Sequence, residues 1–233
     1  MKMFTSIFAD LLHLFFPHIC TGCGSDLVNK EHLLCLECIS QLPHTGFAPH
    51  AHNPIEHIFR GRVPLVAAHS EFFFTKASVI QHLIHQLKYN GKKEIGVYLG
   101  EVIGHNLLIS NRFLAVDYII PLPMFADKEK KRGYNQATII CNGISAVMNI
   151  PVLNGVVTRK YLTETQTRKS RSDRWDNVAN SFTVKDVEKL KNKHILLIDD
   201  VVTTGASLEA CARNILQIEG VHLSIATLAY ASK

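Results

Sequence analysis

Two neighbouring carboxylates followed by a short hydroxyl-rich turn are the most distinctive chemical pattern in the sequence. Asp199 and Asp200 end an apolar run that begins at Ile195, and residues 203–205 read Thr-Thr-Gly. Backbone N–H groups of such a turn, together with the start of a following helix, make a cradle for a phosphate dianion. Because like charges repel, the two carboxylates should instead face neutral hydroxyls, with a divalent cation nearby. The pattern therefore predicts a site for a ribose 5-phosphate.

The residues of this predicted site follow one another along the chain. Asp199 and Asp200 are the candidate catalytic pair, and we expect the phosphate to be bound by the seven residues that follow them: Val201, Val202, Thr203, Thr204, Gly205, Ala206 and Ser207. The hydroxyls in this run add donors, and the glycine lets the backbone approach the ligand closely. A P-loop is excluded because the segment lacks the Gly-Lys-Ser/Thr ending. Receiver domains of response regulators contain a similar acidic strand, but at the domain start and without Thr-Thr-Gly.

Four of the six cysteines form two Cys-x-x-Cys pairs, Cys20/Cys23 and Cys35/Cys38, with eleven residues between the pairs. Each pair lets a tight turn aim two thiolates at one point, and two such turns complete a tetrahedral four-sulfur site. The spacing predicts zinc, with an iron–sulfur site or disulfides as the alternatives. Four protein ligands leave no open position, so we expect the metal to be structural. Cys141 and Cys211 lie on apolar helix faces and are expected to be core residues.

Alternating apolar and amphipathic segments must position these groups. Apolar strands are predicted over 65–74, 116–124, 151–159, 194–200 and 222–231, and helices over 77–89, 94–109, 135–148 and 206–218. Strands separated by helices indicate an α/β fold with a mainly parallel sheet and helices on both faces. Ligands bind such sheets at the carboxyl ends of the strands, which is where the two carboxylates fall.

The chain divides into three predicted parts. Residues 1–43 hold an N-terminal helix and the cysteine pairs, residues 44–64 are a connector rich in His, Pro and Gly, and residues 65–233 form the α/β domain. The first twenty residues are apolar enough to suggest a signal peptide. Asp10 and His13 interrupt that run and no small-x-small cleavage site follows it, so we favour an amphipathic helix that docks on the body of the protein.

Composition sets broad limits on the function. With 233 residues, 47% of them hydrophobic and 19% charged, the chain can form a packed core, and global disorder is excluded. The net charge of +5 permits anionic ligands without demanding them. Few cysteines at this length predict a reducing, cytoplasmic location. The N-terminal apolar run is shorter than the ~20 residues of a membrane-spanning helix, so no transmembrane segment is expected.

The segment Ile195–Ser207 closely resembles the 5-phosphoribosyl-1-pyrophosphate (PRPP) loop of type I phosphoribosyltransferases. In that family the two acidic residues bind the ribose 2- and 3-hydroxyls, and the Thr-Thr-Gly run grips the 5-phosphate. Together with the cysteine pairs, the motifs Leu87–Tyr89, Pro121–Pro123 and Lys131–Ala137 extend the resemblance to the ComF family of competence-related proteins, over nearly the whole chain. The resemblance implies a type I phosphoribosyltransferase fold with a small N-terminal zinc finger.

The resemblance also implies further contacts to PRPP and its leaving group. The pyrophosphate-binding loop would be Pro121, Leu122, Pro123 and Met124. Possible contacts to substrate or leaving group are Lys88, Tyr89, Arg132, Gly133, Asn135 and Gln136. Mg²⁺ would bridge the ribose hydroxyls and pyrophosphate. Two departures from the family pattern are Tyr134, where phenylalanine is common, and the loosely matching polar segment 160–177, which we expect to close over PRPP as a lid.

Two classes of function remain open. The first is a glycosyltransferase that transfers ribose 5-phosphate from PRPP to an unidentified acceptor. The second is a non-catalytic module that senses PRPP or binds single-stranded DNA during natural transformation, with Tyr89, Tyr134 or Trp175 stacking on bases. Residues 128–176 carry ten Lys or Arg against four Asp or Glu, so the positive charge is concentrated near the predicted site. We favour a role in DNA uptake with a functional PRPP site.

Overall fold

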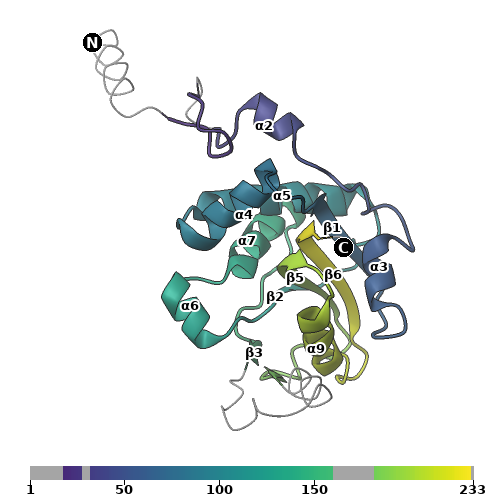
Figure 1. Ribbon diagram of the computed structural model, residues 1–233. Coiled ribbons are helices and arrows are strands. Elements are labelled where there is room, and N and C mark those ends of the chain that lie inside the picture. Colours follow the sequence, from purple (N-terminus) through teal and green to yellow (C-terminus); the bar gives the residue numbers. More distant parts are fainter. Residues whose placement is uncertain (1–17, 28–31, 160–180, 232–233) are drawn as a thin grey trace, which may run out of the picture.

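A four-stranded parallel sheet forms the centre of the protein (Figure 1). The computed structural model describes residues 18–27, 32–159 and 181–231. The sheet has the strand order β1-β6-β5-β2 and consists of β1 (Ala67–Phe73), β6 (His222–Tyr230), β5 (His194–Val202) and β2 (Tyr118–Pro121). Strands β3 (Val157–Arg159) and β4 (Phe182–Val184) form a separate antiparallel pair. The predicted mainly parallel sheet is confirmed.

Helices cover both faces of this sheet (Figure 1). One layer contains α4 (Val79–Tyr89), α5 (Lys93–Ile109) and α7 (Gln136–Met148), and the other contains α3 (Pro54–Phe59) and α9 (Ala206–Ile215). Successive residues of β5 alternate between the two hydrophobic cores, with Leu196 in the first and Leu197 in the second. This alternation follows from the two-residue repeat of a strand and explains why β5 is apolar throughout its first part. Cys141 and Cys211 are fully buried in these cores, as predicted.

Two segments differ from the pattern expected from sequence. Within 151–159, Val152 makes only a single bridge to Ile119, and β3 begins after a turn at Gly155, whose φ is +73°. The basic segment after β2 forms a short helix, α6 (Ala126–Arg132). Because α6 buries no residue, hydrophobic periodicity gave no signal for it. The predicted N-terminal helix and the predicted lid, with Trp175, lie outside the described residues.

The connector 44–64 runs along the edge of the sheet and contains α3. The backbone N–H of Thr45 donates to the carbonyl of Glu71 at 2.9 Å, and Asn53 caps α3 by accepting from two of its backbone amides. Ile55 and Phe59 of α3 are fully buried in the second core. The connector is therefore part of the packed α/β body.

A buried carboxylate on β1 joins the connector to the sheet. Glu71 accepts hydrogen bonds from His44 Nδ1 at 2.7 Å, His69 Nε2 at 2.9 Å and Asn106 Nδ2 at 2.7 Å. Burial alone would raise the pKa of Glu71, but the hydrogen bonds and charges of the two histidines outweigh burial and lower it.

We predict that Glu71→Gln lowers the free energy of unfolding at pH 7 by about 1–3 kcal/mol, because three donors lose an anionic acceptor. A carboxyl group with a lowered pKa stabilises the fold above its unfolded pKa, and this contribution is lost as the pH falls through the folded pKa. Urea unfolding should therefore separate variant and wild type at pH 7 and bring them together in acid. The exposed Glu188→Gln serves as control, and equal stability of Glu71→Gln and wild type at pH 7 would contradict the assignment.

Candidate functional site

The two predicted carboxylates lie at the carboxyl end of β5. Asp199 and Asp200 are both partly buried, and the backbone N–H of Asp200 donates to Asp199 Oδ1 at 2.8 Å. The strand ends at Val202, and the next three residues turn into α9 with Thr203 and Thr204 exposed. The acid pair, the turn and the start of a helix are therefore adjacent at the carboxyl end of the sheet strands, as the sequence predicts.

Gly205 shapes this turn, residues 203–205, which we call the phosphate loop after its predicted role. It precedes α9 in the left-handed conformation, with a φ of +73°. A Cβ at this position would lie 2.8 Å from the ring of Phe59 and 2.9 Å from the side chain of Ile58. Both the backbone conformation and the close contact with α3 therefore require glycine.

The two carboxyl groups of the acid pair have different electrostatic environments. Burial, and then the charge of Asp200, raise the pKa of Asp199 to about 8, against the opposing effects of the Asp200 amide, Lys88 and Arg159. Lys88 Nζ lies 2.7 Å from Asp200 Oδ2, at the end of α4. Lys88 thus pairs with Asp200, whereas burial and the charge of Asp200 favour the protonated form of Asp199.

A cationic pocket of about 450 Å³ lies beside Lys88. Its lining is Lys88, Tyr89, Gly91, Lys128, Lys131, Arg132 and Tyr134. Four of these seven residues are basic and none is acidic, so the pocket is suited to anions. Tyr89 is 66% exposed, with the Arg132 guanidinium 5.4 Å from its ring centroid. The Tyr134 hydroxyl instead donates to the Leu87 carbonyl, so this tyrosine is held in place.

Two further residues that the resemblance implicates, Asn135 and Gln136, make hydrogen bonds within the protein. Asn135 caps α7 through a 3.0 Å bond from the Ala137 amide, and its Nδ2 donates to the carbonyl of Leu122 at 2.9 Å. Gln136 is buried and accepts a hydrogen bond from Arg132. Asn135 and Gln136 thus hold the predicted pyrophosphate loop and the cationic pocket in position, and direct contact between these two side chains and a ligand remains a prediction.

Arg159 is a residue of this region that the motifs did not single out. Its guanidinium carbon lies 4.1 Å from the ring centroid of Phe125 and 5.0 Å from that of Phe182. It lines a second pocket of about 350 Å³ together with Pro121, Pro123 and Met124. The positive charge of Arg159 opposes the rise in the pKa of Asp199. A residue of this second pocket therefore interacts electrostatically with the acid pair. No sequence motif marks Arg159, because its partners are distant in the chain.

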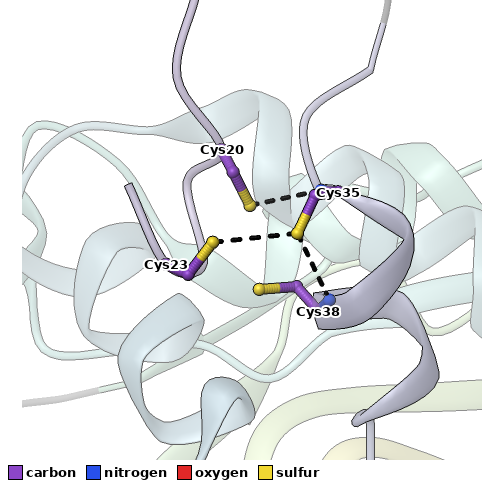
Figure 2. A group of neighbouring side chains, drawn as sticks. All are labelled: Cys20, Cys23, Cys35 and Cys38. Atoms are coloured by element: carbon purple, nitrogen blue, oxygen red, sulfur yellow. Dashed lines mark hydrogen bonds between the residues drawn. The ribbon is translucent and has the colours of Figure 1, made fainter. Parts of the chain in front are cut away.

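The four paired cysteines converge on one point (Figure 2). Their Sγ atoms all lie within 4.8 Å of one another, and all four thiols are free. Backbone amides of Gly22 and Cys35 donate to Cys20 Sγ at 3.4 and 3.2 Å. Burial would raise the pKa of Cys20, but backbone hydrogen bonds lower it, and hydrogen bonds with Ser25 lower the pKa of Cys23 to about 6. Burial instead raises the pKa of Cys38, so it is the convergence of the four Sγ atoms that fits a tetrahedral four-sulfur metal site.

Gly22 allows the close approach of the two cysteine turns. A Cβ there would lie 2.7 Å from Cys38 Sγ. The helix α2 (Leu36–Ser40) begins immediately after Cys35 and carries Cys38 to the cluster. Leu34 and Leu42 pack in the same core as α4 and α5, so the cysteine module is joined to the α/β domain through apolar contacts.

Comparisons with known proteins agree with this architecture. The family model described as a phosphoribosyl transferase domain matches residues 131–233. The chain is 26% identical to competence protein F of Haemophilus influenzae over 87% of this chain and 86% of that protein. It is 28% identical to DNA utilization protein YhgH of Escherichia coli K12, covering 85% of this chain and 84% of YhgH. It is 23% identical to competence protein ComFC of Bacillus subtilis, covering 86% of this chain and 72% of ComFC.

Among the described residues, no helix has the length and apolar character needed to span a membrane. The matches to competence protein F and ComFC cover 87% and 86% of this chain. The chain therefore carries an N-terminal four-cysteine cluster, matches the phosphoribosyl transferase model over residues 131–233, and is similar over most of its length to competence protein F, YhgH and ComFC.

Proposed function

We propose that this protein binds PRPP with Mg²⁺ at the carboxyl end of β5 and acts in the uptake or use of DNA. The observation that carries the PRPP site is the adjacency of the acid pair, the phosphate loop and the start of α9. The role in DNA uptake is supported by the names of its homologues, which are competence and DNA utilization proteins.

The chemistry of PRPP matches the three parts of the site. The 5-phosphate would accept hydrogen bonds from the amides and hydroxyls of the phosphate loop and Ser207. The ribose hydroxyls would donate to Asp199 and Asp200, and the pyrophosphate needs compensating positive charge. Lys88 supplies a cation beside the acid pair, and the cationic pocket extends from it.

Mg²⁺ fits the donor set of the acid pair, because hard cations prefer carboxylate oxygens and phosphates. Asp199 and Asp200 are the residues that would hold the ion with its ligand. Bound Mg²⁺ would neutralise charge on the leaving pyrophosphate. Lys88 is paired with Asp200 in this structure, so ligand binding would compete with an existing ion pair.

Ribosyl transfer would break the C1–O bond between ribose and pyrophosphate and develop positive charge on the ribose ring. Little covalent work falls to the protein, so positioning and electrostatics would carry the reaction. Asp199 and Asp200 would orient the ribose and stabilise the developing charge. Basic groups of the cationic pocket would stabilise the departing pyrophosphate.

The PRPP proposal is tested by calorimetric titration of the wild-type protein with PRPP, with and without Mg²⁺. The expected result is saturable binding that requires Mg²⁺. A second assay adds PRPP, Mg²⁺ and pools of bases or DNA and measures pyrophosphate. Release of pyrophosphate supports transfer, binding without release supports a PRPP sensor, and the absence of any binding contradicts the proposal.

Single-stranded DNA is the second candidate ligand, favoured by the cationic pocket and by the exposed ring of Tyr89. Phosphate contacts would come from the basic side chains, and a base would stack on Tyr89. Tyr134 is a poorer stacking platform, because its hydroxyl is bonded to Leu87 and Lys93 Nζ lies 4.9 Å from its ring centroid.

We predict that the triple variant Lys128→Gln, Lys131→Gln, Arg132→Gln binds single-stranded DNA more weakly and with a smaller dependence on salt. The slope of log K against log salt should shrink by about 0.7 for each DNA phosphate that the variant no longer neutralises. Fluorescence anisotropy at several salt concentrations measures the slope. The control neutralises three exposed lysines elsewhere, Lys76, Lys185 and Lys189. Equal weakening of DNA binding in both variants, or wild-type binding that is indifferent to salt, would exclude this pocket as the DNA site.

A further inference from the structure

Arg62, a residue of the connector, donates hydrogen bonds to the phosphate loop and to α3. Its Nη1 donates to the carbonyl oxygen of Thr204 at 2.9 Å and to that of Ile58 at 2.9 Å. Its Nη2 forms an ion pair with Glu209 in the first turn of α9. One guanidinium thus joins the end of α3, the phosphate loop and the helix that follows it.

Glu209 is the buried anchor of this contact. Its side chain is 8% exposed, and it also pairs with Arg213 Nη2 at 2.9 Å on the outer side of α9. The backbone N–H of Glu209 donates to the carbonyl of Gly205 at 2.8 Å, which starts the hydrogen-bond pattern of α9. Two arginines therefore share one carboxylate, and Arg62 is the one that also bonds the phosphate loop.

The bond to Thr204 fixes the orientation of a peptide unit in the phosphate loop. A trans peptide is planar, so its C=O and N–H point in opposite directions. With the Thr204 carbonyl turned towards Arg62, the N–H of Gly205 is directed away from Arg62. Phe59 and Ile58 of α3 leave no room for a side chain at position 205, because a Cβ there would lie 2.8 and 2.9 Å from them.

We propose that Arg62 is a positioning residue for phosphate binding: by holding the Thr204 carbonyl, it directs the Gly205 N–H towards the 5-phosphate. This inference rests on the proposed PRPP site. It assigns the connector a part in ligand binding that its irregular sequence does not indicate, since Arg62 and Thr204 are 142 positions apart.

The test compares Arg62→Gln with Arg213→Gln, which removes the other arginine from the same carboxylate and leaves the bond to the loop in place. Calorimetry measures the affinity of each variant for ribose 5-phosphate and for inorganic pyrophosphate. We expect Arg62→Gln to bind ribose 5-phosphate about 10-fold more weakly, equivalent to removing one hydrogen bond to a charged group. Its affinity for pyrophosphate should be unchanged, and Arg213→Gln should bind both ligands like the wild type.

Equal binding of ribose 5-phosphate by Arg62→Gln and wild type would overturn the inference, as would equal weakening in Arg62→Gln and Arg213→Gln. If Arg62→Gln does not fold, Arg62→Lys keeps a cation beside Glu209 but lacks the fork that bonds the loop, and the same selective decrease in affinity is expected. Wild-type protein that binds neither ribose 5-phosphate nor PRPP would instead refute the proposed function itself.

Discussion

The variant Asp199→Asn is expected to bind PRPP about 100-fold more weakly in the presence of Mg²⁺, while its ligand-free fold becomes more stable at alkaline pH. The decrease in affinity follows from removing a carboxyl group that would accept hydrogen bonds from the ribose hydroxyls and would help to hold Mg²⁺. Calorimetry of variant and wild type gives the change in affinity directly.

The gain in stability has a defined pH dependence. A carboxyl group whose folded pKa is raised contributes most stability below its unfolded pKa, and that contribution is lost as the pH rises through the folded pKa. For Asp199 this window extends from the ordinary value of 3.8 to about 8. Urea unfolding should show Asp199→Asn more stable than wild type at pH 9, by about 1–2 kcal/mol because the side chain retains some contact with solvent.

Asp117→Asn is the matched control, because this carboxylate has the opposite shift. Burial would raise the pKa of Asp117, but the amide of His194 and the charge of Lys193 lower it. Its replacement should therefore destabilise the protein at neutral pH and leave PRPP affinity unchanged.

An Asp199→Asn variant that binds PRPP normally would remove the acid pair from the site, and one that is less stable than wild type at pH 9 would contradict the raised pKa of Asp199.

Zinc removal is expected to have the largest effect on the N-terminal module. We predict about one zinc per chain, because four cysteine ligands complete a closed tetrahedral site. Structural zinc contributes about 10–16 kcal/mol of apparent binding free energy in zinc-finger peptides, so the module should unfold when a chelator removes the metal. Elemental analysis gives the metal, and proteolysis of residues 18–43 reports the unfolding.

Thiol reactivity provides the control for this prediction. Cys141 and Cys211 are fully buried in the α/β domain and should stay unreactive with or without chelator. The four clustered thiols should be protected by zinc and become reactive when it is removed. Absence of metal with four freely reactive thiols would contradict the zinc site, and visible absorption from an iron–sulfur chromophore would favour that alternative.

Local patterns in the sequence predicted the parts of the molecule whose causes are local. The apolar run of β5, the acid pair and the two Cys-x-x-Cys turns each depend on neighbouring residues, and the described structure contains all of them. The helix α6 was not predicted, because it has no buried face to produce periodicity.

These local patterns could not predict interactions between segments that are distant in the sequence. Arg62 contacts the phosphate loop, and Arg159 lies near the rings of Phe125 and Phe182, only because the fold brings segments that are distant in the sequence together. Lys88 was implicated by its motif, but its ion pair with Asp200 depends on how α4 ends beside β5. The sequence therefore predicted which residues are chemically important better than it predicted what holds them in place.

The most direct test of the PRPP site is a crystal structure of the protein with PRPP and Mg²⁺. We predict the 5-phosphate on the backbone amides of residues 203–207 and the ribose hydroxyls on Asp199 and Asp200, with Lys88 released from Asp200. Phosphates found only in the cationic pocket, with the end of β5 left free of ligand, would contradict the proposed site.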